Sequence, residues 1–225
     1  MPKRYYPLVT GETYHVFNRG IAHTPIFTDI REYKRAIATI KFYQIDSQPI
    51  KLSRYLVMSS ELRTIFYKVR LRSADKLVDI IGFCLMPNHF HFLLKQLKDK
   101  GISTFMRILQ NSYTRYFNTK NKRDGPILKG QFKAVRIERD EQLLHVSRYI
   151  HLNPYTSFIT RSVEDLLKYP WSSLPEYVNY IKKERLCNRN LVLSLFKSAR
   201  EYKKFVLNHA DYQRNLKSIK HLTLE

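Results

Sequence analysis

The sequence is poor in several residue types, and each shortage excludes a class of protein. Only two of its 225 residues are cysteines, Cys84 and Cys187, and their separation fits no zinc-binding spacing. No apolar run approaches the roughly 18 residues that a membrane-spanning helix needs. The first fifteen residues, "MPKRYYPLVTGETYH", contain no apolar signal core, so we expect them to belong to the mature protein. These shortages predict a cytoplasmic protein with reduced thiols.

Acidic residues are also scarce relative to basic ones. Asp and Glu number 19 against 40 Lys and Arg, which gives a formal net charge of +21 and a pI near 10.0. An excess of this size indicates a polyanionic partner, and nucleic acid is the usual one. The chain also has 16 Tyr and 13 Phe, whose rings can stack on unpaired bases, although most aromatic residues serve the core. Charge and rings together favour single-stranded nucleic acid.

Hydrophobic periodicity predicts strands and helices in alternation. The helix at 101–121 is expected to be capped by Ser103 or Thr104, and the helix that begins near Asp140 is expected to stop before Pro154. Residues 50–72 are mixed and basic, show no clear period, and are interpreted as an insertion. Strands are predicted at 13–20, 77–87, 89–96 and 131–138, and helices at 29–44, 101–121, 140–153 and, in a basic tail, 191–210.

Few strands alternating with helices indicate the α+β class. A single sheet with helices on one face, as in split βαβ arrangements, suits this order. We expect one domain over residues 1–180 and a basic helical C-terminal extension over 181–225.

Two histidines interrupt the apolar stretch "FCLMPNHFHFLLKQ". Because side chains alternate along a strand, His89 and His91 point to the same side, about 7 Å apart, while Phe90 and Phe92 face the core. Two such imidazoles can converge on one divalent ion. The alternative is a pair of hydrogen-bonded or surface histidines, since a bare His-x-His is common by chance. The apolar flanks and the basic charge favour the metal, and Leu93 excludes the His-x-His-x-Asp pattern of metallohydrolases.

A second polar group lies in "LLHVSRYIHLNP". Residues four apart share a helical face, so His145, Tyr149 and Asn153 form one stripe, which Arg148 and His151 flank. A tyrosine can attack a phosphodiester if a cation or metal assists it. From the residues alone, Tyr113 and Tyr116 remain alternatives to Tyr149, and core packing is an alternative for each.

Several motifs occur together in a fixed order, and their combination resembles a known family. The motifs are "YHVFNRG", "MPNHFHFLL", "NSYTRYFN", "GQFKAVRI", "SRYIHLNP" and "YPWSS", between about Tyr14 and Tyr177. They resemble the REP-associated tyrosine transposases, which belong to the single-tyrosine HUH transposases of the IS200-like superfamily. In that family HUH denotes histidine, a hydrophobic residue and histidine, which here is His89-Phe90-His91.

The resemblance implies a ferredoxin-like antiparallel sheet and an enzyme that nicks and rejoins single-stranded DNA at hairpins or palindromic repeats. It implies Tyr149 as the nucleophile, which forms a 5′-phosphotyrosine, and Mg²⁺ or Mn²⁺ held by His89, His91 and Asn153. Basic side chains would hold the DNA backbone. The candidates are Arg115, Lys133, Arg136 and Arg148.

The rival hypothesis is a basic nucleic-acid-binding protein that keeps the fold without the chemistry. Two features depart from the family pattern: residues 50–72 are long for its compact form, and the tail after Asn188 has no residue-by-residue match. The sequence leaves open the target DNA, whether the chain forms a homodimer, and whether its element is still mobile. It predicts no membrane partner.

Overall fold

A four-stranded antiparallel sheet forms the centre of the protein. The structure is a computed structural model, and it describes residues 7–73, 75–179 and 186–215. The strand order is β2-β3-β1-β4. The strands are β1 (Thr13–Arg19), β2 (Val78–Met86), β3 (His89–Gln96) and β4 (Lys133–Ile137). The helices are α1 (Ile30–Tyr43), α2 (Leu52–Val57), α3 (Ser60–Ser73), α4 (Gly101–Asn121), α5 (Asp140–Thr156), α6 (Val163–Leu167), α7 (Leu174–Tyr177), α8 (Asn190–Leu193) and α9 (Ala199–Leu207), and Ile21–His23 form a 3-10 turn.

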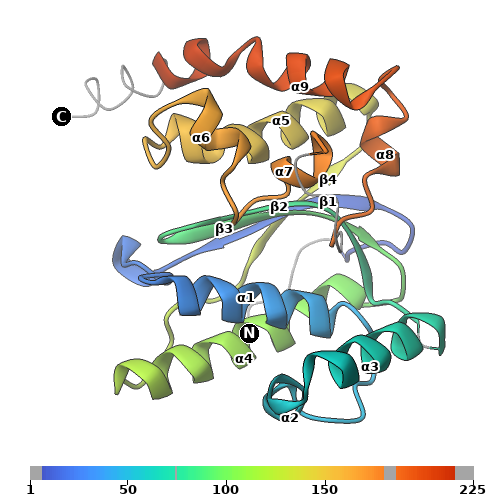
Figure 1. Ribbon diagram of the computed structural model, residues 1–225, viewed down its shortest axis with the longest axis vertical. Helices are drawn as coiled ribbons and strands as arrows, with labels where there is room; N and C mark the ends of the chain where they lie inside the picture. The colour runs from blue at the N-terminus through green and yellow to red at the C-terminus, as the bar shows by residue number, and fades with distance from the viewer. Residues whose placement is uncertain (1–6, 74, 180–185, 216–225) are drawn as a thin grey trace.

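Helices cover both faces of this sheet, so the expectation of helices on one face was wrong. In Figure 1, α1 and α4 lie below the sheet, while α5, α6, α7 and α9 lie above it. The sequences of β2 and β3 explain why both faces are covered. Consecutive residues of β2 and β3 are almost all buried, and a strand buried on both sides is a continuous apolar run without alternation.

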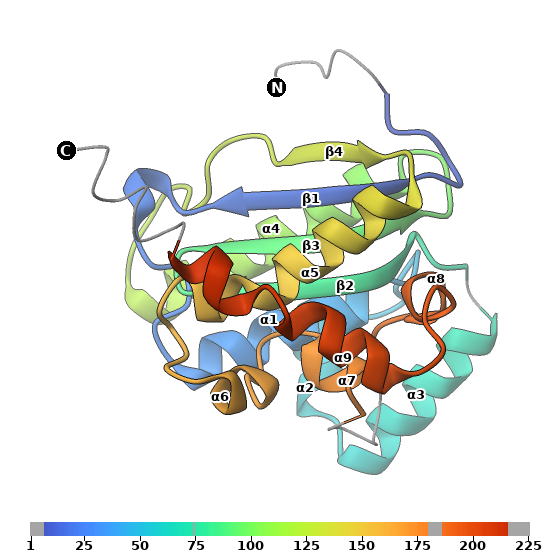
Figure 2. The ribbon, with the colours of Figure 1, turned by 90° about the horizontal axis from the view of Figure 1, so that it is seen from above.

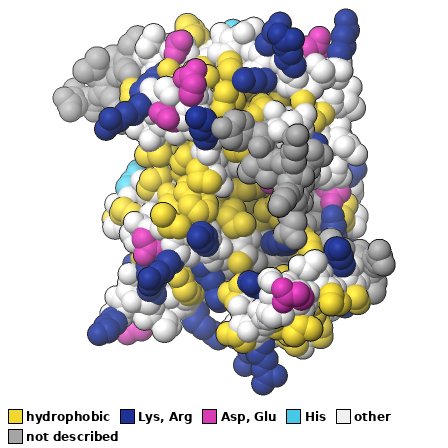
Figure 3. Space-filling model, in the orientation of Figure 1, with side chains coloured by type: hydrophobic (Ala, Val, Ile, Leu, Met, Phe, Trp, Pro, Cys, Tyr) yellow, Lys and Arg dark blue, Asp and Glu magenta, His cyan; other side chains and the backbone are white. Residues whose placement is uncertain are grey.

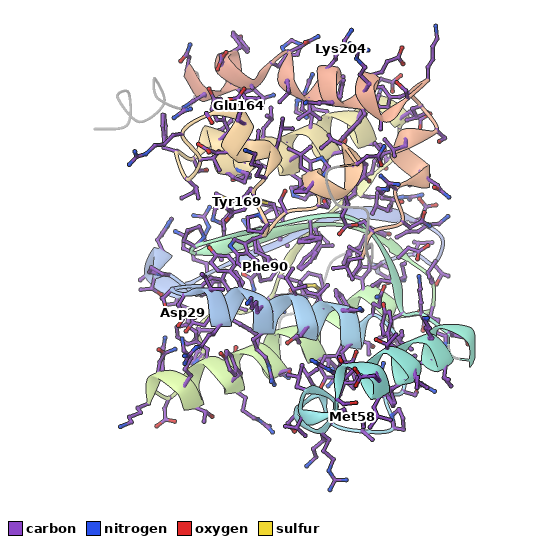
Figure 4. All side chains as sticks on the ribbon, in the orientation of Figure 1. Asp29, Met58, Phe90, Glu164, Tyr169 and Lys204 are labelled. Carbon is purple, nitrogen blue, oxygen red and sulfur yellow. The ribbon has the colours of Figure 1, made fainter. Side chains whose placement is uncertain are left out.

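The strand register shows which residues lie on the same face of the sheet as the histidine pair. His91 pairs with Phe17 on β1 and with Cys84 on β2. Paired residues of antiparallel strands point to the same side, so these three share the face that α5 covers. Phe90 and Phe92 are buried on the opposite face, as predicted. In Figure 4, Phe90 lies between the sheet and α1. We call the side toward α5 the histidine face.

Residues 50–72, which the sequence left unassigned, contain α2 and most of α3. Leu52 and Tyr55 of α2 form a small cluster with Phe42 at the end of α1. This cluster is separate from the main core, which explains why the segment shows only a weak apolar period.

Helix α4 has the predicted bounds, 101–121, but a different residue caps its start. Helix α4 begins at Gly101, directly after left-handed Lys100, and the Gln96 side chain accepts the Ile102 N–H at 3.1 Å. Gln96 therefore takes the capping role that was assigned to Ser103 or Thr104. A Cβ on Gly101 would lie 2.3 Å from the Leu77 carbonyl oxygen, so the close approach of the chain requires glycine here.

Helix α5 continues through Pro154 and ends at Thr156, whereas the sequence predicted an end before the proline. Proline costs most in a helix interior, and here it is in the last turn. The Pro154 carbonyl accepts the N–H groups of Ile159 and Thr160, and the Asn153 carbonyl accepts that of Ser157. These bonds satisfy the end of the helix after the proline.

The described part of the C-terminal region packs on α5. Tyr202 and Val206 of α9 are fully buried, and the Tyr202 hydroxyl lies 2.6 Å from His151 Nδ1. The domain boundary expected near residue 180 falls in 180–185, which lies outside the described residues, as does 216–225. Within the described ranges, no helix is long and apolar enough to cross a membrane.

Candidate active site on the histidine face

Three histidines, not two, gather on the histidine face. His89 and His91 come from β3, and their ring centroids are 5.1 Å apart. His15 comes from the neighbouring strand β1, and its Nε2 lies 3.0 Å from His91 Nδ1. Sequence reasoning missed His15 as a site residue. Its signal was available, because in "YHVFNRG" it alternates with the buried residues Tyr14 and Val16.

Tyr149 of α5 completes this group. Its ring centroid lies 5.3 Å from that of His91 and 6.0 Å from that of His15, in edge-on contact with both. The side chain remains 40% exposed, so a ligand can reach it. Helix α5 runs across the sheet on this side, as Figure 2 shows from above, and one of its exposed positions therefore stands over the histidines.

The two alternative tyrosines lie on the other side of the sheet, on α4. Tyr113 is buried, and its hydroxyl donates a hydrogen bond of 2.5 Å to the Ile26 carbonyl oxygen. Burial also raises the pKa of its hydroxyl far above the ordinary value. Tyr116 is half-buried beneath the Arg35 guanidinium, whose central carbon is 5.0 Å from the ring centroid. Neither ring approaches the histidine face.

In both His89 and His91, the ring nitrogen Nδ1 contacts another side chain. His89 Nδ1 lies 2.6 Å from the Asn88 side-chain oxygen, and His91 Nδ1 is the atom that meets His15. Burial lowers the pKa of His15 to about 4, so its ring is neutral at physiological pH and one of its nitrogens is an acceptor. A His15 Nε2 that accepts from His91 Nδ1–H makes Nε2 the basic nitrogen of His91. This is the tautomer of a histidine that binds a metal through Nε2.

Asn153 lies on α5 one turn beyond Tyr149, as the stripe argument placed it. It is buried, and its Oδ1 lies 3.3 Å from the Ser157 hydroxyl. Within residues 7–73, 75–179 and 186–215, no three His, Cys, Asp or Glu side chains are arranged to hold a metal ion. A metal here would therefore depend on two imidazoles and an amide oxygen.

Most of these site residues lie in a segment of the chain that matches a family model. The family model described as "Transposase IS200 like" matches residues 51–153, a range that begins with α2 and includes His89, His91, Tyr149 and Asn153. This chain is similar to the IS200-like transposases over that range. The fold agrees with a solved structure of a REP-associated tyrosine transposase bound to a REP hairpin. That likeness has a TM-score of 0.52 at 16% identity, over 80% of this chain and 86% of that one. No curated protein matches the chain.

His151 of the motif "RYIHLNP" lies over the same side of the sheet, against Gly82 of β2, and its two ring nitrogens contact residues other than the three histidines. It is buried between α7 and α9, with Nε2 2.8 Å from the Ser173 hydroxyl and Nδ1 2.6 Å from the Tyr202 hydroxyl. Burial lowers its pKa to about 3. His151 therefore fixes the helix that carries Tyr149, whereas His145, one turn before Tyr149, is exposed.

The four basic residues proposed for DNA lie in different places on the protein. Lys133 is on the histidine face, because it pairs with Phe17, and it is exposed. Arg136 is also on β4 but forms an ion pair with Glu12 at 3.0 Å. The guanidinium of Arg148 stacks over Phe205 of α9, 4.5 Å from the ring centroid. Arg115 is on α4, on the other side of the sheet from Tyr149. The structure brings only Lys133 onto the same face as the three histidines.

Sequence reasoning missed another basic residue on this face. Arg19 pairs with His89, so its side chain leaves the sheet on the same side, and it is exposed. Its Nη1 lies 3.3 Å from the His23 ring. The motif "FNRG" carried the signal, since Arg19, Phe17 and His15 follow at intervals of two along the strand and therefore share one side of the sheet.

Proposed function

We propose that this protein is an IS200-like transposase that nicks and rejoins single-stranded DNA at hairpin or repeat sequences through a 5′-phosphotyrosine on Tyr149. The observation that supports this best is the placement of three tyrosines. Tyr149 contacts the rings of His91 and His15 and remains exposed, whereas Tyr113 and Tyr116 lie beyond the sheet.

The histidines fit a divalent metal, either Mg²⁺ or Mn²⁺. Metal-binding histidines usually hold their second nitrogen in a hydrogen bond, and Asn88 and His15 engage Nδ1 of His89 and His91 in this way. The ligands would be Nε2 of both rings, with Asn153 supplying an amide oxygen. When bound, the ion would polarise a non-bridging oxygen of the scissile phosphate.

Tyr149 supplies the attacking atom. Its phenolic oxygen forms a bond to phosphorus and loses its proton to solvent, while the bond from phosphorus to the 3′ oxygen breaks. The departing 3′ oxygen takes up a proton and becomes a free hydroxyl. The phosphotyrosine conserves the energy of the phosphodiester, so a second 3′-hydroxyl can reverse the attack and join new strands without ATP. Lys133 and Arg19 on the same face would hold the backbone near this phosphate.

The test is covalent labelling of the protein. Parent protein and Tyr149→Phe are mixed with end-labelled hairpin DNA and Mn²⁺, denatured, and separated by size. The parent should carry label and Tyr149→Phe should not, because the variant loses one oxygen and little volume. Tyr116→Phe is the matched control and should still carry label, since its ring lies on the other side of the sheet.

Two outcomes would contradict this proposal. Label on Tyr149→Phe together with its loss from Tyr116→Phe would place the nucleophile on α4. A parent that binds hairpins tightly but never carries label, across DNA of varied sequence, would favour the rival hypothesis of a binding protein without chemistry.

A further inference from the structure

The outer side of α3 carries an apolar stripe that is exposed to solvent. Leu62, Ile65 and Val69 are 56, 59 and 55% exposed, and we call these three residues the α3 stripe. They belong to the segment 50–72, which has no role in the proposed function. In Figure 3, hydrophobic side chains lie at the surface of the lower right part of the molecule, where Figure 1 places α2 and α3.

The inner side of α3 attaches the helix to the rest of the protein. Phe66 packs against Phe42 of α1 and Tyr55 of α2, with ring centroids 6.3 and 5.5 Å apart. Arg70 Nη2 donates a hydrogen bond of 2.9 Å to the Asp46 carbonyl oxygen. Because these contacts already hold the helix in place, the α3 stripe is available for a contact outside the fold.

The spacing of the α3 stripe is that of a contact between two helices. Its members follow at intervals of three and four, which are the a and d positions of a heptad. At about 100° per residue they span only about 60° of the helix circumference. Helices that lie in a membrane surface have a large apolar face, whereas this stripe is narrow and contains no aromatic ring. A single amphipathic helix therefore fits it better than a membrane does.

The surroundings of the α3 stripe are basic. Residues 50–72 contain six Lys or Arg and one acidic residue, Glu61. Lys68 is exposed and follows Ile65 by three residues, so it lies beside the stripe. Across the described ranges, no carboxylate lies within salt-bridge distance of Arg54, Arg63 or Lys68. These cations favour a partner that carries carboxylates next to its own apolar residues.

A second copy of this chain fits the α3 stripe less well than an acidic helix does. Each copy has a net charge of +21, so two copies repel each other. Three aliphatic side chains bury far less than the roughly 800 Å² per partner of a typical stable interface. Little apolar contact would therefore offset the repulsion, whereas an acidic helix adds attraction to the same contact.

We infer that the α3 stripe docks an amphipathic helix of another protein, one that carries Asp or Glu beside its apolar residues. Leu62, Ile65 and Val69 would pack between the apolar side chains of that helix, and Lys68 would face its carboxylates. This role does not depend on the proposed function, because the candidate active site is built from β1, β3 and α5.

The test measures how the full chain binds two labelled synthetic peptides, by fluorescence anisotropy. The heptad peptide has three heptads with Leu at a and d and Glu at e and g, so repulsion between its glutamates opposes pairing with itself. The scrambled peptide has the same composition and charge but no apolar stripe. It therefore reports the attraction that any acidic peptide has for a basic protein.

Two double variants are compared with the parent. Ile65→Gln/Val69→Gln removes two members of the α3 stripe without changing the charge. Leu191→Gln/Leu195→Gln is the matched control, because both leucines are 40% exposed and lie in or next to α8. All four side chains are exposed, so urea unfolding of both variants should match that of the parent.

We expect Ile65→Gln/Val69→Gln to bind the heptad peptide at least about tenfold more weakly than the parent, because two buried aliphatic side chains are lost from the contact. Leu191→Gln/Leu195→Gln should bind it like the parent. All three proteins should bind the scrambled peptide equally, and more weakly than the parent binds the heptad peptide. Equal affinity of the parent for the two peptides, or unchanged affinity of Ile65→Gln/Val69→Gln for the heptad peptide, would overturn the inference.

Two further measurements test the other occupants, and we expect both to be negative. Vesicles containing phosphatidylserine that sediment the parent but not Ile65→Gln/Val69→Gln would assign the α3 stripe to a membrane surface. A dimer of the parent in analytical ultracentrifugation that this variant abolishes would assign it to a second copy. Either result would overturn the inference. A parent that carries no label in the Tyr149 experiment would defeat the proposed function, while the peptide comparison would still decide the role of α3.

Discussion

At the scale of single residues, His15 changes how the histidine pair is understood. A strand His-x-His motif names two ligands but says nothing about which nitrogen of each ring binds. The contact between His15 Nε2 and His91 Nδ1 bears on that choice, because a ring whose Nδ1 is engaged by a neighbour would bind a metal through Nε2. Asn88 does the same for His89 from the preceding residue.

Replacing His15 should therefore weaken metal binding without removing a ligand. His15→Leu loses the acceptor and keeps a similar volume, and we expect the affinity for Mn²⁺ to fall by about 10- to 100-fold, the usual effect of losing a partner of a metal ligand. His15→Gln, which places a polar atom near the former Nε2, should restore much of that loss. The measurement is free Mn²⁺ by electron paramagnetic resonance, which needs no catalysis. If His15→Leu binds Mn²⁺ as tightly as the parent, His15 does not orient His91.

At the scale of elements, α5 carries both the candidate nucleophile and the residue that anchors it. Tyr149 faces the histidines, while His151, two residues later, faces α7 and α9. His151 Nδ1 lies 2.6 Å from the Tyr202 hydroxyl and Nε2 lies 2.8 Å from the Ser173 hydroxyl, which donates to the Phe83 carbonyl oxygen. Both ring nitrogens are satisfied with the ring neutral, so the network joins α5 to β2, α7 and α9.

Removing one hydroxyl from this network should destabilise the fold measurably. Tyr202→Phe leaves His151 Nδ1 and the nearby Ser147 hydroxyl without the partner that Tyr202 provides at 2.6 and 3.3 Å. A buried polar group without its partner costs about 1–3 kcal/mol of unfolding free energy. Urea unfolding followed by circular dichroism measures this change. Tyr212→Phe is the control, because that ring is 63% exposed, and it should unfold like the parent. A matching midpoint for Tyr202→Phe would show that the network adds no stability.

The same elements show what the sequence could predict. Helices α1, α4 and α5 have apolar residues at helical spacing, β2 and β3 are continuous apolar runs, and all five elements were found. Helix α3 was missed because its apolar residues Leu62, Ile65 and Val69 are exposed and mark no buried face. The end of α5 was placed too early because the rule for proline ignores the bonds that the Pro154 carbonyl makes after the helix. The alternation in "YHVFNRG" places His15 on the side opposite to Tyr14 and Val16, but it does not show that this side meets His91 of another strand, so His15 was missed.

At the scale of the whole molecule, charge and burial act in different places. The net charge of +21 comes from the excess of Lys and Arg over Asp and Glu, whereas the pH dependence of stability depends on histidines buried between the layers. His15 lies between the sheet and α5, and His151 lies between α5 and the α7 and α9 helices. Burial lowers the pKa of the first to about 4 and of the second to about 3.

Stability should therefore fall as the pH falls below neutrality. Both histidines titrate near pH 6.5 in the unfolded chain, so between pH 6.5 and about 4 the unfolded state binds more protons than the folded state. The stabilisation is complete above pH 6.5 and is lost as the pH drops toward the folded pKa values. Each histidine contributes up to about 2 kcal/mol between pH 7 and pH 5, a window that lies above the titration of most carboxylates.

The measurement is urea unfolding at pH 7, 6 and 5 in the presence of a chelator, so that metal release does not contribute. His15→Gln should lose about half of the pH dependence, because one of the two titrating rings is gone while the His151 network is intact. A free energy of unfolding that stays constant from pH 7 to pH 5 would mean that the layers do not keep these rings neutral. An unchanged slope in His15→Gln would assign the whole effect to His151 and remove His15 from the buried set.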